Sequence, residues 1–178
     1  MSHNRSHLIA TLFTLTTLIA TGTAAAADSS NDPKKQPISI YADRLSIDDT
    51  KGVSRYQGHV ELQQGDLKFS GDELELTQKD GSVTMMQAIG KPAHFERSEP
   101  KPLKAEASRI DYDNKNGEVI LRGSAQLWQD GDQFSGELIH YNIDSRHVKA
   151  QGGSTDSTGD AQTGRVHVII RPKAESEK

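Results

Sequence analysis

Apolar and polar residues alternate in short runs along the chain from residue 38 onward. The run Ile38-x-Ile40-x-Ala42 is followed by Leu45-x-Ile47 in the opposite phase, which predicts a bulge or a tight bend between the two runs. Further alternating runs occupy residues 56–62, 67–71, 74–76, 110–112, 121–127, 134–136, 139–143 and 165–171. Turn-forming residues separate these runs, and no segment carries a sustained helical stripe of apolar residues. Short strands in this arrangement predict an all-β sandwich, barrel or roll.

The alternating runs belong to an internal repeat. Residues 42–77 align without a gap on residues 107–142, 65 positions further along the chain. Matching residues are Ala42 and Ala107, Arg44 and Arg109, Asp48 and Asp113, Gly52 and Gly117, Gly58 and Gly123, Leu62 and Leu127, Gln64 and Gln129, and Phe69-Ser70-Gly71 and Phe134-Ser135-Gly136. A repeated unit buries on its neighbour the face that it cannot bury alone, so the repeat predicts a stacked, elongated protein. Gly58 and Gly123 fall within alternating runs, where they predict bends or a close backbone approach.

The first 27 residues are predicted to be a cleaved signal peptide. Arg5 precedes an apolar stretch at residues 8–21, and Ala25-x-Ala27 fits a small-residue cleavage site. The stretch is shorter than the about 20 residues that a membrane-spanning helix needs, and an uncleaved N-terminal anchor is the alternative. We therefore expect an exported protein.

The rest of the chain divides by composition. Residues 28–36 are predicted to be a flexible segment, residues 37–171 a single β domain, and residues 172–178 a disordered tail. Residues 91–102 contain three prolines and are predicted to form a loop between the two repeat units. Residues 151–164 are rich in Gly, Ser, Thr and Asp and are predicted to be a flexible loop before a last strand at residues 165–171.

Composition limits the core and the chemistry. The chain has no cysteine, which excludes disulfides, thiolate metal sites and a cysteine nucleophile. Only 33% of its residues are hydrophobic, which is too few for a broad core but enough to line a narrow one between two thin sheets. The net charge of −4 and the lack of a basic cluster beyond Lys34-Lys35 argue against a nucleic-acid partner.

Motifs for catalysis or cofactor binding are missing from the sequence. It contains no GxxxxGK[ST] or GxGxxG phosphate loop and no GxSxG nucleophile elbow, and the histidines after the leader lack metal-ligand spacing. Residues 111–117 fail as an EF-hand loop because Lys115 occupies the third ligand position and Gly117 comes one place late. Asp111 and Asp113 would lie on one strand face, where a carboxylate pair for glycoside cleavage is an alternative. We predict no catalytic residue, metal or cofactor.

A set of segments in fixed order resembles a known family. These segments are residues 36–43 (QPISIYAD), 56–60 (YQGHV), 90–95 (GKPAHF), 107–112 (ASRIDY) and 121–125 (LRGSA). Over residues 36–150 the chain resembles the LptA/OstA family of periplasmic lipopolysaccharide-transport proteins, and after residue 151 the match is poor.

The resemblance implies both a fold and partners. The fold would be an elongated, twisted β-jellyroll of stacked, V-shaped antiparallel strands around an apolar interior groove that holds lipopolysaccharide acyl chains. The protein would be periplasmic and would assemble head to tail into a bridge. The bridge would run from an inner-membrane export complex with an LptC-like protein to an outer-membrane translocon whose LptD-like N-terminal domain shares the fold.

Family positions and alternation together give the candidate site. The groove positions of the family fall on Ile38, Ile40, Phe95 and Tyr112. The expected lipid-binding groove consists of Ile38, Ile40, Val60, Leu62, Phe69, Leu76, Phe95, Tyr112, Leu127 and Phe134. The strands expected at the free edges contribute Ile38, Ile40, Val166, Val168 and Ile170 to contacts with other copies or partners.

Burial of acyl chains is the expected source of affinity. Each buried CH₂ contributes about 0.8 kcal/mol, so a stretch of about 10 carbons contributes about 8 kcal/mol before ordering costs. A negatively charged chain must hold an anionic glycolipid mainly in this way. Two alternatives stay open: a structural scaffold of an envelope complex that binds no lipid, and a β-roll enzyme that acts on envelope polysaccharide.

Overall fold

The computed structural model describes residues 36–99, 101–153 and 164–172, and within them the chain is built from strands. The strands are β1 (Ile38–Tyr41), β2 (Arg44–Asp48), β3 (Val53–Gln64), β4 (Leu67–Lys79), β5 (Ser82–Arg97), β6 (Leu103–Asp113), β7 (Glu118–Gln129), β8 (Asp132–Asn142), β9 (His147–Gln151) and β10 (His167–Ile169). The predicted signal peptide, almost all of segment 28–36, most of the loop at 151–164 and residues 173–178 of the predicted tail lie outside the described residues.

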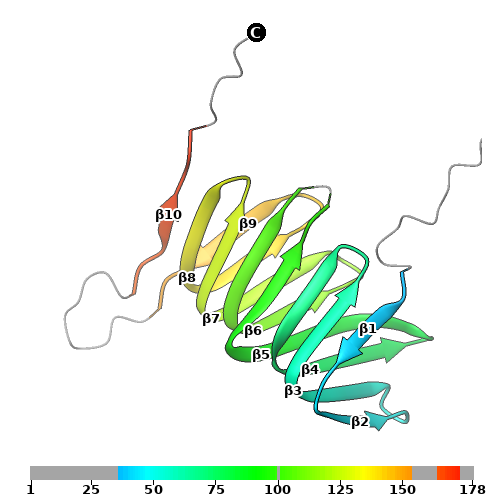
Figure 1. Ribbon diagram of the computed structural model, residues 1–178. Coiled ribbons are helices and arrows are strands. Elements are labelled where there is room, and N and C mark those ends of the chain that lie inside the picture. The colour runs from blue at the N-terminus through cyan, green and yellow to red at the C-terminus, as the bar shows by residue number, and fades with distance from the viewer. Residues whose placement is uncertain (1–35, 100, 154–163, 173–178) are drawn as a thin grey trace, which may run out of the picture.

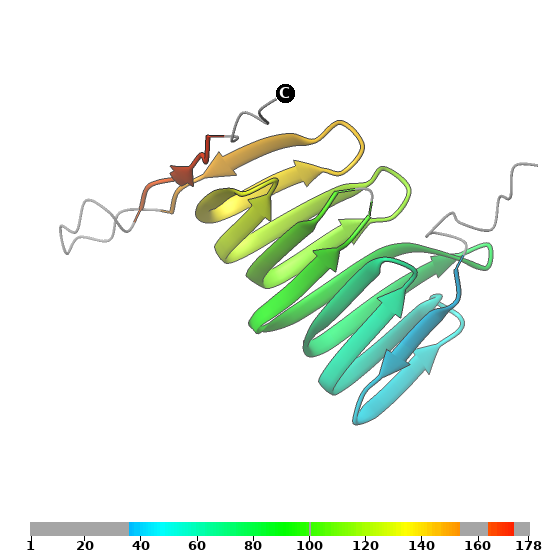
Figure 2. The ribbon, with the colours of Figure 1, turned by 45° about the horizontal axis from the view of Figure 1, so that its top comes forward.

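The strands form one antiparallel sheet in which chain neighbours pair in sequence. Strands β3 to β8 follow one another as a meander, with β1 and β2 both paired to β3 at one end and β9 and β10 both paired to β8 at the other. Figure 1 shows the result as a row of V-shaped turns, with β1 and β2 at one end and β9 and β10 at the opposite end. Figure 2 shows the same stack from a second direction. The all-β, antiparallel, elongated jellyroll predicted from the sequence is confirmed.

A bend in the middle of every long strand turns the flat meander into a V. The pairing register shifts at this point between each pair of neighbouring strands from β3 to β8. Such irregularities kink a strand and increase its twist. They divide the sheet into two halves, which we name arm A and arm B. Arm A comprises residues 38–41, 60–71, 93–99, 101–107, 125–136 and 167–169, and arm B comprises residues 44–57, 73–89, 109–122 and 138–151.

The repeat found in the sequence is a repeat of these bends. Gly58 in β3 and Gly123 in β7 have φ values of +79° and +77°, a left-handed conformation that residues with a side chain rarely adopt. A Cβ on Gly58 would lie 2.2 Å from Asp43 Oδ2, and a Cβ on Gly123 would lie 2.8 Å from Ser108 Oγ. Asp43 and Ser108 are themselves 65 positions apart. The prediction of bends at both glycines is therefore confirmed, and the nearest atoms that a Cβ would meet there belong to side chains rather than to a neighbouring backbone.

Two predictions about individual segments are wrong. Residues 91–102 are not a loop, because β5 continues through Pro92 to Arg97 and only a short turn precedes β6. Pro92 lies at the bend, where the register shift between Ile89 and Ala93 removes the need for a ladder hydrogen bond. The last strand is also shorter than residues 165–171, since β10 spans only three residues.

The core lies between the two arms. Inward side chains of both arms form one cluster, most of whose members in the middle strands are almost completely buried. Phe69 and Phe95 of arm A pack against Tyr112 of arm B, with ring centroids 6.1 Å and 5.9 Å from that of Tyr112. The core is thus a single thin layer that runs along the stack, as the low hydrophobic content requires.

Candidate functional site

The inner face of the V is largely apolar, with Ser54 and Gln64 as its buried polar residues. Register pairs Ile40 with Leu62 and Leu62 with Phe69, and Phe69 pairs in turn with Phe95, so the row crosses from β1 to β5. All ten residues of the predicted groove lie on this face. Seven of them are 0–2% exposed, namely Val60, Leu62, Phe69, Leu76, Phe95, Tyr112 and Leu127, and Ile38, Ile40 and Phe134 are partly buried. Their contact with lipid remains a prediction.

Fourteen further buried residues face inward but were not assigned to the groove from the sequence. These are Leu67, Leu74, Met86, Ala88, Ala93, Leu103, Ala105, Ala107, Ile110, Val119, Leu121, Ala125, Ile139 and Tyr141. In several strands the inward residues change from odd to even positions, or the reverse, at the bend. An alternation pattern carried through the bend therefore assigns the residues of one arm to the wrong face. The alternation of Met86 with Ala88 is the signal that could have revealed the arm B half of β5.

Side chains of the protein itself fill the middle of the groove. Phe95 is 0% and Tyr112 1% exposed, and the Phe69 and Phe95 rings lie 4.9 Å apart, centroid to centroid. Burial raises the pKa of Tyr112 to about 12, so its hydroxyl stays neutral at any physiological pH. A long apolar ligand can reach these side chains only if the arms move apart.

The two ends of the groove are open. At the N-terminal end, Leu45 and Ile47 pair with Tyr56 and Ser54 and therefore face inward, yet each is 56% exposed. At the C-terminal end, Val168 pairs with Phe134 on the inner face and is 42% exposed. Val166, Val168 and Ile170, which the sequence places at an edge for contact with partners, are 38%, 42% and 73% exposed, and their contact with a partner stays a prediction.

An ion pair joins the arms at their free ends, opposite the bends. Arg146, in the β8–β9 turn of arm B, binds the carboxylate of Asp130, in the β7–β8 turn of arm A. The Gln129 side-chain oxygen also accepts from Arg146, in the amide orientation that satisfies both groups. We call the gap between the free ends of the arms the mouth. This contact holds the mouth closed near the C-terminal end.

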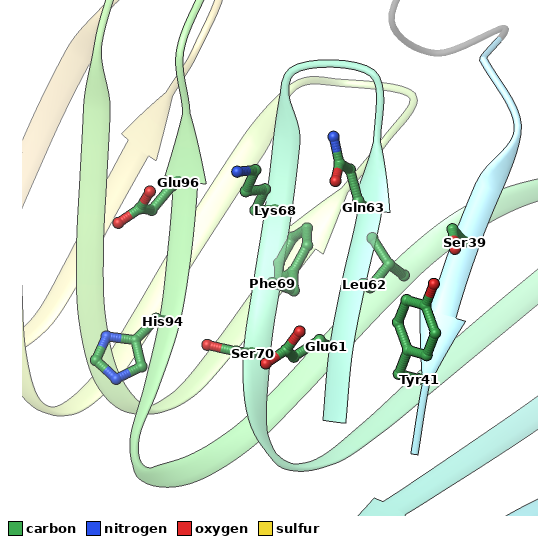
Figure 3. A pocket seen from close by; sticks show the side chains of 10 residues that line it. All are labelled: Ser39, Tyr41, Glu61, Leu62, Gln63, Lys68, Phe69, Ser70, His94 and Glu96. Atoms are coloured by element: carbon green, nitrogen blue, oxygen red, sulfur yellow. The ribbon is translucent and has the colours of Figure 1, made fainter. Parts of the chain in front are cut away.

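A separate recess of about 400 Å³ lies on the outer face of arm A. Outward side chains dominate its lining, among them Lys68, His94 and Glu96, while the buried Leu62 and Phe69 lie at its floor (Figure 3). Such a polar, solvent-open lining does not suit acyl chains.

The alternative chemistry weighed for Asp111 and Asp113 finds no support in their surroundings. The Asp111 carboxylate is bound by Arg109 Nε at 2.9 Å and by Arg122 Nε at 3.4 Å. Asp113 accepts the backbone N–H groups of Lys115 and Asn116 at 2.9 Å and 3.0 Å, as in a polar turn. Among the residues that the structure describes, no group of three potential ligands could hold a metal ion, and no helix is long and apolar enough to cross a membrane.

Comparison with known proteins places the chain in a family. A family described as "LptA/(LptD N-terminal domain) LPS transport protein" matches residues 39–147, which include every strand from β2 to β8. The chain belongs to this family. One protein similar to it in sequence is the lipopolysaccharide export system protein LptH of Pseudomonas aeruginosa. That protein is 33% identical over 171 residues, which cover 93% of this chain and 95% of LptH.

Other members of the LptA family agree with this assignment. LptA of Escherichia coli K12 is 30% identical over 119 residues, covering 65% of this chain and 64% of that protein. The LPS-assembly protein LptD of Aeromonas hydrophila is 29% identical over 117 residues, covering 52% of this chain and 14% of that protein. The crystal structure of Pseudomonas aeruginosa LptH superposes with a TM-score of 0.68 at 31% identity and covers 79% of this chain and 99% of that one.

Proposed function

We propose that this chain is a periplasmic lipopolysaccharide carrier whose inner face shields the acyl chains of lipid A. The single observation that carries the proposal is the largely apolar inner face, open at both ends, in a member of a family of LPS transport proteins. The ten predicted groove residues all lie on that face. The scaffold and enzyme alternatives have no comparable feature in their favour.

Acyl chains would exchange with contacts that the protein makes with itself. The cluster of Phe69, Phe95 and Tyr112 bridges the arms, so separating the arms exposes apolar surface that an acyl chain then covers. The closed protein and the lipid-bound protein both bury this apolar surface. Burial of the acyl chain, at about 0.8 kcal/mol for each CH₂, therefore offsets the free-energy cost of separating the arms. This exchange suits a carrier that must also release its lipid.

Strand directions favour head-to-tail assembly. Strands β1 and β2 are antiparallel to β3, and β9 and β10 are antiparallel to β8. Five antiparallel pairings separate β3 from β8, so β10 of one copy set beside β1 of the next copy would again be antiparallel. The same holds for β9 beside β2. Each arm of the V can therefore continue into the next copy, and such a contact does not close on itself.

Partners that share the fold would use the same edges. The family joins LptA with the N-terminal domain of LptD, so an LptD-like translocon can accept one end of the stack. An LptC-like protein of the inner-membrane export complex would accept the other end. The exposed inward side chains Leu45 and Ile47 would then be covered by the neighbour.

Photo-crosslinking tests the proposal through the alternation of the strands. A photoreactive amino acid is placed at Leu62, which points inward, or at Glu61, which points outward, and again at Leu127 and Gln126, the matching positions of the second unit. We expect lipopolysaccharide adducts at Leu62 and Leu127 and few at Glu61 and Gln126. Equal capture on both faces would refute the groove, and no capture at any position would favour the scaffold.

A further inference from the structure

A recess of about 340 Å³ lies in the mouth, between the free ends of the two arms. Arm A contributes Arg97 and Gln129 from the ends of β5 and β7, Lys101 from the β5–β6 turn and Leu103 from β6, and arm B contributes Tyr141 from β8 and Ile143, Asp144 and Arg146 from the β8–β9 turn. The recess is thus built from strand ends and turns of both arms, and it opens onto the solvent.

Three cationic side chains and one carboxylate line this recess. Arg97, Lys101 and Arg146 face one lining carboxylate, Asp144. Two further carboxylates bind the cations without lining the recess: Asp66 contacts Arg97 Nε at 3.0 Å, and Asp130 contacts Lys101 Nζ at 3.6 Å as well as Arg146.

The cations reach further into solvent than the carboxylates that hold them. The side chains of Lys101 and Arg146 are 51% and 41% exposed, whereas that of Asp130 is 24% exposed. Burial works to raise the pKa of Asp130, but Arg146 and Lys101 outweigh it and leave the pKa below its ordinary value, so this carboxylate is ionised at neutral pH. A guanidinium has five N–H donors in a planar fork, so donors remain for a second anion.

The floor of the recess is apolar and continuous with the core. Leu103 and Tyr141 are buried members of the core cluster, and Ile143 packs against it. Cations around an apolar floor match an amphiphile whose anionic head stays at the surface while its chains enter the groove.

We propose that this recess binds the phosphate-bearing headgroup of the lipid, with Lys101 and Arg146 as its phosphate ligands and Arg97 as an additional cation. Arginine and lysine are the side chains that recognise phosphate, arginine with paired hydrogen bonds. This inference rests on the proposed function as a lipid carrier and adds a binding site for the headgroup. A headgroup bound there would orient the lipid so that its acyl chains point between the arms. Because Arg146 also bridges the mouth, a bound phosphate competes with Asp130 for it and loosens the contact that keeps the arms together.

Binding of two matched lipids tests the inference. The mature protein is titrated with lipid A that carries its phosphates and with the same lipid A after removal of the phosphates. The variants are Lys101→Gln, Arg146→Gln and their combination, and the control is Arg55→Gln, which removes an outer-face cation of β3 that pairs with Glu75 at the other end of the stack from the recess. Circular dichroism and thermal melting verify that each variant is folded.

The inference predicts a loss confined to the phosphorylated lipid. A charge-assisted hydrogen bond is worth about 1.5–3 kcal/mol, so each single variant should weaken binding of phosphorylated lipid A by about tenfold or more. Binding of the dephosphorylated lipid and all binding by Arg55→Gln should stay within about twofold. In the wild type, high salt should reduce the difference in affinity between the phosphorylated and the dephosphorylated lipid. In the double variant this difference should be small at any salt concentration.

The possible failures point to different conclusions. Equal weakening for both lipids, or no weakening for either, overturns the headgroup site while the carrier stands. A wild type that binds neither lipid overturns the proposed function and this inference with it. If the double variant does not fold, Lys101→Gln alone decides, because its half-exposed side chain makes only a surface ion pair.

Discussion

The middle of the stack and its two ends are made of the same alternating strands but differ in what covers them. In the middle, Phe95, Tyr112 and Leu121 are at most 1% exposed, because strands on both sides and the facing arm enclose them. At the ends, Leu45 and Ile47 also face inward yet are 56% exposed. Since these side chains occupy equivalent positions in the V, the difference comes from the missing next strand rather than from the residues.

This difference separates two tasks. The middle stabilises the fold and, once opened, offers the apolar surface for a lipid. The ends carry unpaired edges and uncovered apolar residues, which fit a protein completed by a neighbour of the same shape. Stability and assembly should therefore respond to different substitutions.

The largest expected effect is that of truncating a middle side chain. Phe95→Ala removes a fully buried ring from the aromatic cluster that joins the arms and should lower the free energy of unfolding by about 3–5 kcal/mol. Leu45→Ala, at an end of the stack, should change the free energy of unfolding by less than about 1 kcal/mol, because Leu45 is already 56% exposed to solvent. Urea unfolding of the monomer measures both. Similar losses in the two variants would remove the distinction between middle and ends.

The bends should come next. Gly58→Val and Gly123→Val place a branched side chain in a left-handed conformation, which costs about 1–3 kcal/mol, and each adds a clash with Asp43 or Ser108. Gly81→Val is the matched control, because Gly81 has a φ of +76° but no atom within 4 Å of a Cβ. Thermal melting should show larger losses at both bends than at Gly81. If both variants melt at the wild-type temperature, the repeated glycines are not required for the bends.

Removal of residues 165–178 should act on assembly far more than on stability. β10 pairs with only three residues of β8 and its side chains are exposed, so the circular dichroism spectrum and the unfolding midpoint should change little. Arm A would lose its C-terminal edge strand, and head-to-tail association should weaken or disappear. Sedimentation over a wide concentration range measures this, and unchanged oligomers would show that β10 is not a docking strand.

The smallest effect concerns an exposed pair at the first bend. His59 Nδ1–H donates a hydrogen bond to Asp43 Oδ2 at 2.9 Å, and this bond raises the pKa of His59 above its ordinary value of 6.5. A raised pKa in the folded state means that the pair stabilises the fold below about pH 6.5 and that this contribution is lost as the pH rises through the folded pKa. An NMR titration should show the raised pKa and its return to the ordinary value in Asp43→Asn. An unchanged pKa in that variant would show that the pair does not form in solution.

Alternation and repetition predicted most strands, the bends at Gly58 and Gly123 and part of the inward face, because these depend on residues close in sequence or at a fixed spacing, but they missed β5 and the first half of β6. Pro92 was misleading, since a proline suggests a loop unless the bend that tolerates it is known. The sequence places Val168 and Ile170 at a free edge, and their exposure agrees with that position, but the strand that would cover them cannot be predicted because it belongs to another molecule. The ion pair of Arg146 with Asp130 could not be predicted from the sequence either, because the two residues lie in turns of different arms that only the folded V brings together.

Separation of the arms on lipid binding is the central claim, and a distance across the mouth tests it most directly. Spin labels are attached to Glu99→Cys in the β5–β6 turn of arm A and Lys115→Cys in the β6–β7 turn of arm B, both exposed. The chain has no other cysteine, so only these sites are labelled. Pulsed electron paramagnetic resonance should show a longer distance with lipopolysaccharide bound and no change with a short-chain detergent below its micelle concentration. An unchanged distance in a sample whose lipid binding is verified by crosslinking at Leu62 would contradict the account.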